Sequence, residues 1–362
     1  MFNNIYRNRT ILITGHAGFK GSWLAFWLKQ LGAEVVGYSL KPDTDETLYD
    51  ILGLRNLLKE SLIADIRDVR QLENFFARHK PSVVFHLAAQ PLVRLSYSEP
   101  VRTYETNVIG TLKVLEAARK TPSVKAFVNV TTDKCYENVE KKEGYRENDP
   151  MGGYDMYSSS KGCSEILTSS YRRSFLPDGK PFALASARAG NVIGGGDWAA
   201  DRLIPDCIRA FRKGETVFIR NPYATRPWQF VLEPLAGYLR LGQKLLEQGA
   251  EYARGYNFGP EMNKDIKVCE VAQMVAGIWG NGKVEIGRGD GLHEATLLQL
   301  NIEKAGRELG VYPVYDAKEA IAETTRWYKT YYDGKSNMEE FTREQINKFV
   351  ARAQNKKIEW SL

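Results

Sequence analysis

The chain has 362 residues, of which 43% are hydrophobic and 26% are charged, and its net charge is +6. This composition allows a large buried core in one large domain or two closely connected ones, and the scattered charge gives no case for nucleic-acid binding. Four widely spaced cysteines without a C-x-x-C pair argue against a zinc site and against disulfides, so we expect no metal. Because the N-terminus is polar and leads directly into a predicted strand, we expect a soluble, cytoplasmic protein that does not associate with membranes.

The first predicted strand, residues 11–14, breaks into Gly15, Gly18 and Gly21 and continues as a predicted helix. Glycines at such a turn allow a pyrophosphate to approach the main chain, where the first helical amides meet a phosphate. The G-x-x-G-x-x-G spacing is looser than G-x-G-x-x-G, so the turn alone does not establish a dinucleotide site.

The second and third predicted strands bear on which dinucleotide is bound. Residues 32–39 lack the acid that usually holds the adenosine ribose. Ser39 and Lys41 stand at the end of this strand instead, which leaves both NAD and NADP open. The third strand, residues 61–66, ends near Asp65, which is either a partner for an adenine amino group or the N-cap of the next helix.

The fourth and fifth predicted strands lead to the candidate chemistry. Residues 81–89 end in small side chains, as a backbone close beneath a ligand requires. A helix over about 100–120 follows, and Asn107 within its apolar repeat indicates a buried hydrogen-bonding role. The fifth strand, residues 125–130, runs into Thr-Asp-Lys at 132–134. Ligands bind at the carboxyl ends of strands in doubly wound sheets, so this cluster is a candidate site, and a simple strand-exit turn is the alternative.

The next predicted helix carries Tyr157 and Lys161, which are four residues apart and share one face. An ammonium beside a phenol lowers the pKa of the phenol, which can then take a proton from a hydroxyl while hydride leaves the same carbon. A Tyr-Lys surface pair is the alternative, and the preceding strand and helix units favour the catalytic interpretation.

The alternation of strands and helices ends after a sixth predicted strand over 182–188. We therefore expect a doubly wound parallel sheet within residues 1–190, to which a segment near 226–260 returns. Residues 191–335 then form a smaller mixed α/β region that binds substrate, and residues 336–362 form a charged C-terminal tail.

Together these features resemble the extended short-chain dehydrogenase/reductase superfamily over nearly the full length. Within it, the chain is similar to nucleotide-sugar 4,6-dehydratases, most closely those acting on CDP-glucose, in segments 15–24, 91–97, 132–134 and 190–198. Lys20 belongs to the first of these segments. The resemblance implies a Rossmann-type fold, NAD that is tightly held and regenerated each turnover, a nucleotide-sugar substrate, and a homodimer or higher homo-oligomer.

The residues and this resemblance assign three groups of site residues. The catalytic residues are Thr132, Asp133, Lys134, Tyr157 and Lys161. The cofactor-binding residues are Gly15, Gly18, Phe19, Lys20, Gly21, Ser39, Asp65, Ile66, Leu87, Ala88, Ala89, Tyr157 and Lys161. The substrate-binding residues are Arg94, Ser96, Asn191, Arg202 and Arg226.

The reaction implied by the resemblance begins when Tyr157 takes a proton from the hydroxyl at carbon 4 of glucose while hydride passes to NAD. Loss of water across carbons 5 and 6 then needs an acid, Asp133, and hydride returns to carbon 6. Related dTDP-glucose dehydratases carry Glu where this chain has Lys134. Lys134 is therefore either a base with a depressed pKa or an electrostatic aid to the enolate.

Two other functions fit parts of the sequence. A nucleotide-sugar 4-epimerase shares the glycine turn, Tyr157 and Lys161 but needs no acid at carbon 6, so Asp133 argues against it. A non-catalytic dinucleotide-sensing protein would not need the Tyr-Lys pair. The resemblance also implies a product used in deoxysugar and surface-polysaccharide biosynthesis.

Overall fold

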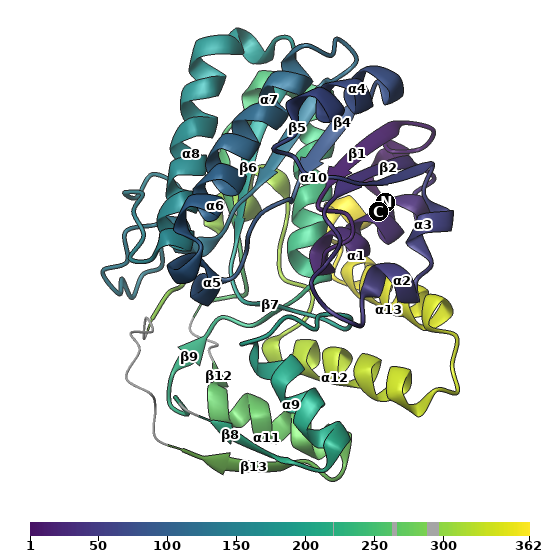
Figure 1. The fold of residues 1–362 in the computed structure, drawn as a ribbon, viewed down its shortest axis with the longest axis vertical. Helices are drawn as coiled ribbons and strands as arrows, with labels where there is room; N and C mark the ends of the chain where they lie inside the picture. Colours follow the sequence, from purple (N-terminus) through teal and green to yellow (C-terminus); the bar gives the residue numbers. More distant parts are fainter. Residues whose placement is uncertain (220, 263–265, 288–296) are drawn as a thin grey trace.

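A computed structural model of the chain describes residues 1–219, 221–262, 266–287 and 297–362. Its centre is a seven-stranded sheet in the order β11-β6-β5-β4-β1-β2-β3, with helices on both faces (Figure 1). The strands are β1 (Thr10–Thr14), β2 (Glu34–Ser39), β3 (Glu60–Ile63), β4 (Val83–His86), β5 (Ala126–Val130), β6 (Ala183–Ala189) and β11 (Gly255–Phe258). All pairings within this sheet are parallel. The chain starts in the middle of the sheet and crosses over after β3, so the predicted Rossmann-type doubly wound fold is confirmed.

Two apolar layers explain why the central strands are continuous runs of buried residues. Leu72, Leu115 and Tyr171 pack on one face of the sheet, whereas Trp23 and Leu239 pack on the other. A parallel strand covered on both faces needs apolar side chains at every position, which β4, β5 and β6 largely supply. The helices of these layers are α1 (Phe19–Gln30), α2 (Leu48–Ile51), α3 (Leu54–Leu57), α4 (Val69–His79), α5 (Val93–Ser98), α6 (Pro100–Tyr104), the π-helix η2 (Glu105–Gly110), α7 (Thr111–Arg119), α8 (Met156–Phe175) and α10 (Leu232–Gln248).

A second, smaller lobe lies below the sheet in Figure 1 and mixes short strands with helices. It contains β8 (Thr216–Ile219) paired with β13 (Lys283–Ile286), β9 (Thr225–Arg226) paired with β12 (Ile266–Lys267), α9 (Leu203–Lys213) and α11 (Val268–Trp279). β7 (Val192–Ile193) and β10 (Gln229–Phe230) pair where the chain enters and leaves this lobe. The chain then returns to the sheet through α10 and β11.

The C-terminal segment forms helices α12 (Ala317–Asp333) and α13 (Met338–Asn355). α12 packs against α11 of the second lobe, whereas α13 packs against α1 of the sheet unit. Ile346 and Phe349 of α13 are fully buried, and the ring of Trp360 stacks on Phe2 at 5.2 Å between centroids. The amine of Met1 donates a hydrogen bond to the carbonyl of Leu362 at 2.8 Å, so the two ends of the chain meet. The charges of residues 336–362 thus lie on the outer face of a packed helix.

Short helices complete the described elements. They are the 3₁₀ helices η1 (Phe2–Asn4), η3 (Asp133–Cys135), η4 (Pro177–Gly179), η5 (Gly249–Tyr252) and η7 (Glu359–Ser361), and the π-helix η6 (Ala305–Leu309). Within the described ranges, no helix combines the length and apolar character needed to cross a bilayer.

Candidate active site

Two glycines of the turn between β1 and α1, Gly15 and Gly21, have no room for a side chain. Gly15 has a φ of +77°, and a Cβ there would lie 2.7 Å from the amide nitrogen of Ala88. A Cβ on Gly21 would lie 2.0 Å from the carbonyl oxygen of Gly15. Gly18 is the N-cap of α1 and has no side chain to cap it, and the amide of Ser22 donates back to the carbonyl of Gly18. The amides at the start of α1 are therefore available to an anionic group.

The ends of β2 and β3 lie beside this turn. Ser39 is buried, and its hydroxyl donates to the carbonyl of Leu40 at 2.8 Å. The carboxylate of Asp65 accepts from the amide of Arg67 at 2.8 Å and from its guanidinium at 2.7 Å. Asp68, whose side chain accepts from the amide of Gln71, is the N-cap of α4. The alternative that made Asp65 the N-cap is therefore wrong, and an adenine group at Asp65 would share its carboxylate with Arg67.

The remaining predicted cofactor residues follow β3 and β4. Ile66 is buried and packs against Gly110, where a Cβ would lie 2.7 Å from its Cδ1 atom. Leu87, Ala88 and Ala89 are half-buried at the carboxyl end of β4. This end of the sheet is where ligands of doubly wound folds bind.

Residues 132–134, hereafter the catalytic segment, leave the end of β5 and begin η3. The hydroxyl of Thr132 donates to the carboxylate of Asp133 at 2.8 Å, and both side chains are buried. Asp133 packs against Gly190 so closely that a Cβ there would lie 1.9 Å from Oδ2. Lys134 is half-buried. The segment therefore packs against the exit of β6.

The start of α8 is fixed by two side chains. Asp155 is the N-cap and accepts from the amide of Ser158 at 2.9 Å. The hydroxyl of Ser96 accepts from the amide of Tyr157 at 3.1 Å and donates to the carbonyl of Val93 at 2.6 Å. Ser96 is fully buried, and its hydroxyl supports the backbone of Tyr157 in this structure.

Asn107 lies in the π-helix η2, which packs against α8. Its side-chain amide donates to Ser160 of α8 at 2.9 Å and to the carbonyl of Gln90 at 3.0 Å, and its oxygen accepts from the amide of Gln90. Its buried hydrogen-bonding role is confirmed.

The electrostatic setting of Tyr157 differs from the prediction. Burial raises the pKa of Tyr157, and the hydrogen bond to Thr132 offsets only part of this effect. The ammonium of Lys161 donates to the carbonyl of Val130 at 3.3 Å, and burial lowers its pKa to about 8. The expectation of a lowered phenol pKa is wrong for this structure, because the desolvation of the phenolate outweighs the effect of Arg202, the neighbouring cation that lowers the pKa of Tyr157.

Lys20 joins the glycine turn to the catalytic cluster, which consists of the predicted catalytic residues at 132–134, 157 and 161. Its pKa is lowered to about 8, mainly by burial and then by the positive charges of Lys161 and Arg202, while Asp133 and Asp197 act in the opposite direction. The start of α1, the catalytic segment and the helix of Lys161 therefore influence one another electrostatically.

Of the predicted substrate residues, Arg202 and Asn191 lie by the catalytic cluster, whereas Arg94 and Arg226 have other contacts. Arg202 forms an ion pair with Asp197 and lowers the pKa of Tyr157, so it lies beside the cluster. Asn191 follows Gly190, the residue that faces Asp133, and has a φ of +37°. The guanidinium of Arg94 lies 3.5 Å from Asp201. Arg226 lies on β9 of the second lobe, where it donates to the carbonyl of Thr225 at 2.8 Å.

The sequence interpretation missed two residues beside the cluster. Asp197, which is 6% exposed, lies within segment 190–198, so its position in that segment was the available signal. Tyr238 lies in the apolar helix α10, where an aromatic residue normally indicates core packing. Its hydroxyl is buried with no hydrogen-bond partner among the described residues, and the ammonium of Lys20 lies 5.9 Å from its ring centre.

Comparison with known proteins places this geometry in a family. A family model described as GDP-mannose 4,6 dehydratase matches residues 12–324. The chain belongs to this family. The match to the GDP-mannose 4,6 dehydratase family spans the central sheet from β1 to β11 and ends within α12.

One curated relative in this comparison is CDP-glucose 4,6-dehydratase of Salmonella typhimurium. It is 48% identical over 337 residues, which cover 91% of this chain and 93% of the relative.

Solved structures agree with the fold. The epimerase Mth375 of Methanothermobacter thermautotrophicus has a TM-score of 0.78 at 24% identity, covering 92% of this chain and 95% of its own. The dTDP-glucose 4,6-dehydratase of Bacillus anthracis, solved in complex with NAD, has a TM-score of 0.73 at 22% identity, covering 92% and 99%.

Proposed function

We propose that the chain is a CDP-glucose 4,6-dehydratase, which converts CDP-glucose to CDP-4-keto-6-deoxyglucose and water. The observation that carries this proposal is the 48% identity to the Salmonella typhimurium enzyme over 91% of this chain. The catalytic segment beside Tyr157 and Lys161 supplies groups for both halves of the reaction. Residues 191–335 form the substrate-binding region in this proposal, with Arg202, Asn191 and Arg226 as substrate residues.

The glycine turn suits NAD because Gly15, Gly18 and Gly21 leave the backbone open to close approach at the start of helix α1. Gly15, Gly18 and Gly21 with the α1 amides would hold its pyrophosphate, and residues 87–89 would line the path toward the cluster. When bound, NAD supplies the acceptor that removes hydride from carbon 4 and later returns it to carbon 6. Because each cycle ends with the cofactor as it began, tight retention serves the reaction better than exchange.

Tyr157 is the proton acceptor for the hydroxyl at carbon 4. Its phenolate is costly in this buried site, and Arg202 is the neighbouring cation that lowers its pKa. Thr132 interacts with the phenol of Tyr157 and lowers its pKa, and Lys161 lies one helical turn away on the same face. These groups hold the phenol at a fixed place, which is where much of the rate enhancement of a positioned base arises.

Elimination follows at carbons 5 and 6. The new ketone makes the proton at carbon 5 acidic. Lys134 either removes this proton, and returns it to carbon 5 when hydride reaches carbon 6, or stabilises the enolate with its positive charge. Asp133, held by Thr132 at 2.8 Å, donates a proton to the leaving hydroxyl at carbon 6.

The proposal is tested by incubating purified protein separately with CDP-, dTDP-, UDP- and GDP-glucose without added reductant. We expect a 4-keto-6-deoxy product from CDP-glucose. A 4-epimerised sugar without loss of water would identify an epimerase instead, and no product from any sugar would defeat both assignments.

Lys134→Met tests the proposed division of labour. It should permit reduction of the bound cofactor by substrate but block the loss of water. Unchanged dehydration would remove Lys134 from the mechanism.

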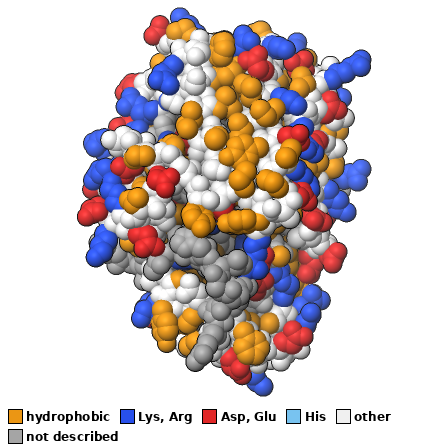
Figure 2. All heavy atoms as spheres, turned by 60° about the vertical axis from the view of Figure 1, so that its left-hand side comes forward, with side chains coloured by type: hydrophobic (Ala, Val, Ile, Leu, Met, Phe, Trp, Pro, Cys, Tyr) orange, Lys and Arg blue, Asp and Glu red, His pale blue; other side chains and the backbone are white. Residues whose placement is uncertain are grey.

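We also propose that the protein is a homodimer that pairs through the outer face of α6, η2, α7 and α8. Figure 2 shows hydrophobic side chains gathered on the sheet-bearing part of this side of the molecule. Val101, Ile109, Ile166 and Phe175 on these helices are 70%, 45%, 58% and 50% exposed. A second copy of the same helices would cover such a patch.

The cellular setting is part of the same proposal. The four cysteines are free, which suits a reducing cytoplasm. The expected keto-sugar is a precursor of deoxysugars for surface polysaccharides.

A further inference from the structure

A buried ion pair lies beneath the catalytic cluster. Glu165 of α8 and Arg188 of β6 meet at 2.8 Å, with side chains only 4% and 6% exposed. Burying two charges carries a large desolvation penalty, so such a pair is weak evidence for a stabilising role by itself. Its hydrogen-bond partners indicate a different role.

One partner lies just before the catalytic segment. The hydroxyl of Thr131 donates to Oε1 of Glu165, and Ser186 of β6 donates to Oε2 at 2.7 Å. Thr131 is directly followed by Thr132 in the chain. The carboxylate of Glu165 therefore fixes the N-terminal end of the catalytic segment.

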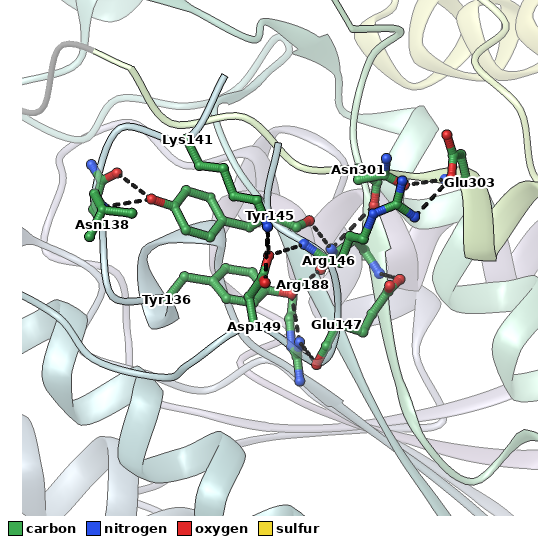
Figure 3. A network of polar contacts seen from close by, with 12 residues as sticks. Tyr136, Asn138, Lys141, Tyr145, Arg146, Glu147, Asp149, Arg188, Asn301 and Glu303 are labelled. Atoms are coloured by element: carbon green, nitrogen blue, oxygen red, sulfur yellow. Dashed lines mark hydrogen bonds and ion pairs between the residues drawn. The ribbon is translucent and has the colours of Figure 1, made fainter. Parts of the chain in front are cut away.

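The other partner lies just after the segment. Nη1 of Arg188 donates to the hydroxyl of Tyr136 at 2.6 Å and to the carbonyl of Glu147 at 3.1 Å. The hydroxyl of Tyr136 in turn donates to Asn257 at 2.8 Å. Figure 3 shows Tyr136, Glu147 and Arg188 within this network. Because Tyr136 lies two residues after Lys134, Arg188 fixes the C-terminal end of the segment.

Glu165 also lies on the same face of α8 as the two catalytic residues of that helix. Tyr157, Lys161 and Glu165 follow at intervals of four residues, so they lie on successive turns of one helix face. Glu165 raises the pKa of Lys161 against the effect of burial. One ion pair therefore connects the row on α8 with both ends of the segment that carries Asp133 and Lys134.

We propose that Glu165 and Arg188 are positioning residues that hold the catalytic segment in register with Tyr157 and Lys161 for the elimination step. This inference rests on the proposed dehydratase activity. Tyr157 and Lys161 are held by α8 itself, whereas Asp133 and Lys134 depend on a short segment clamped at its two ends. Loosening the clamp should therefore slow the loss of water more than the first hydride transfer.

The test compares two rates in one enzyme preparation with bound NAD. Single-turnover formation of NADH after CDP-glucose is added reports oxidation at carbon 4, and formation of the keto-sugar reports elimination. In Thr131→Val and Tyr136→Phe, each of which removes one end of the clamp, NADH should accumulate while the rate of keto-sugar formation falls. The fall should reach about 100-fold if a group moves by about 1 Å.

Glu165→Gln removes the negative charge of the ion pair. It should likewise slow keto-sugar formation more than NADH formation. Thr131→Val and Tyr136→Phe leave the charge next to Lys161 in place, so they report on the segment alone and remain informative if Glu165→Gln does not fold. Glu233→Gln is the matched control, because Glu233 is a buried carboxylate that binds the backbone amides of Val314 and Tyr315. It should keep the wild-type ratio of the two rates even if the protein is less stable.

The inference is overturned if the clamp variants lower both rates by the same factor, or match Glu233→Gln, because the pair would then only support the fold. A wild-type protein that forms neither NADH nor keto-sugar would instead refute the proposed function. An active wild type with unbiased variants refutes the inference alone.

Discussion

Lys161→Met should stabilise the protein while it abolishes activity. Lys161 is 6% exposed, and burial lowers its pKa from 10.5 to about 8. Such a shift corresponds to about 3 kcal/mol of free energy that disfavours the charged side chain in the folded state. Methionine fills similar space without a charge. We therefore expect Lys161→Met to raise the free energy of unfolding at pH 7 by up to about 3 kcal/mol and to stop the formation of keto-sugar.

The pH dependence gives this prediction its sign. Below about pH 8 Lys161 carries its proton in both the folded and unfolded states, so the full cost of burial is present. Between about pH 8 and 10.5 the unfolded state binds more protons than the folded state, so the stability of the wild-type protein rises with pH. The advantage of Lys161→Met should therefore be largest at neutral pH and should shrink toward about pH 10.

Urea unfolding of both proteins at neutral and alkaline pH measures the effect. The titratable groups that interact with the ammonium are Glu165, Cys135, Lys20 and His86. They are present in both proteins, so the difference between the two curves is dominated by Lys161. If Lys161→Met is less stable than the wild type at pH 7, the hydrogen bond to Val130 and the attraction to Glu165 outweigh desolvation, and the reasoning fails.

Three further predictions follow from the glycine turn, the start of α8 and the exposed helix face. Gly21→Ala should lose NAD from the purified protein and weaken the fold, because its Cβ would lie 2.0 Å from a carbonyl oxygen. Gly277→Ala is the control: nothing lies within 4 Å of its Cβ, so it should stabilise α11 and keep NAD. Equal NAD content in the two variants would contradict this prediction. Ser96→Ala should cost about 1 kcal/mol in urea unfolding and lower kcat more than it raises KM, because the amide of Tyr157 loses its acceptor; an unchanged kcat would argue against this support. Ile166→Glu should convert the proposed dimer to a monomer in light scattering, while Ile63→Glu on the edge strand should not, and identical masses would place the interface elsewhere.

The sequence by itself determined the parts of this protein that depend on local pattern. Buried parallel strands require continuous apolar runs, so most of the first six strands could be located from such runs in the sequence. The glycine turn was also readable, because only glycine fits where a Cβ would overlap a carbonyl oxygen. Tyr157 and Lys161 could be placed on one helix face, since helical spacing is a local property.

The tertiary structure decided everything that depends on burial and on contacts between distant segments. The pKa of Tyr157 is raised because the surrounding elements exclude water from the phenolate, which no spacing reveals. The charged segment 336–362 contains α13 and η7, whose buried Phe349 and Trp360 pack against Trp27 and Phe2 from the start of the chain. Glu165 and Arg188 are 23 residues apart and meet only because α8 packs on β6. The sequence names the groups that do the chemistry, and only the folded chain sets their charge and holds them together.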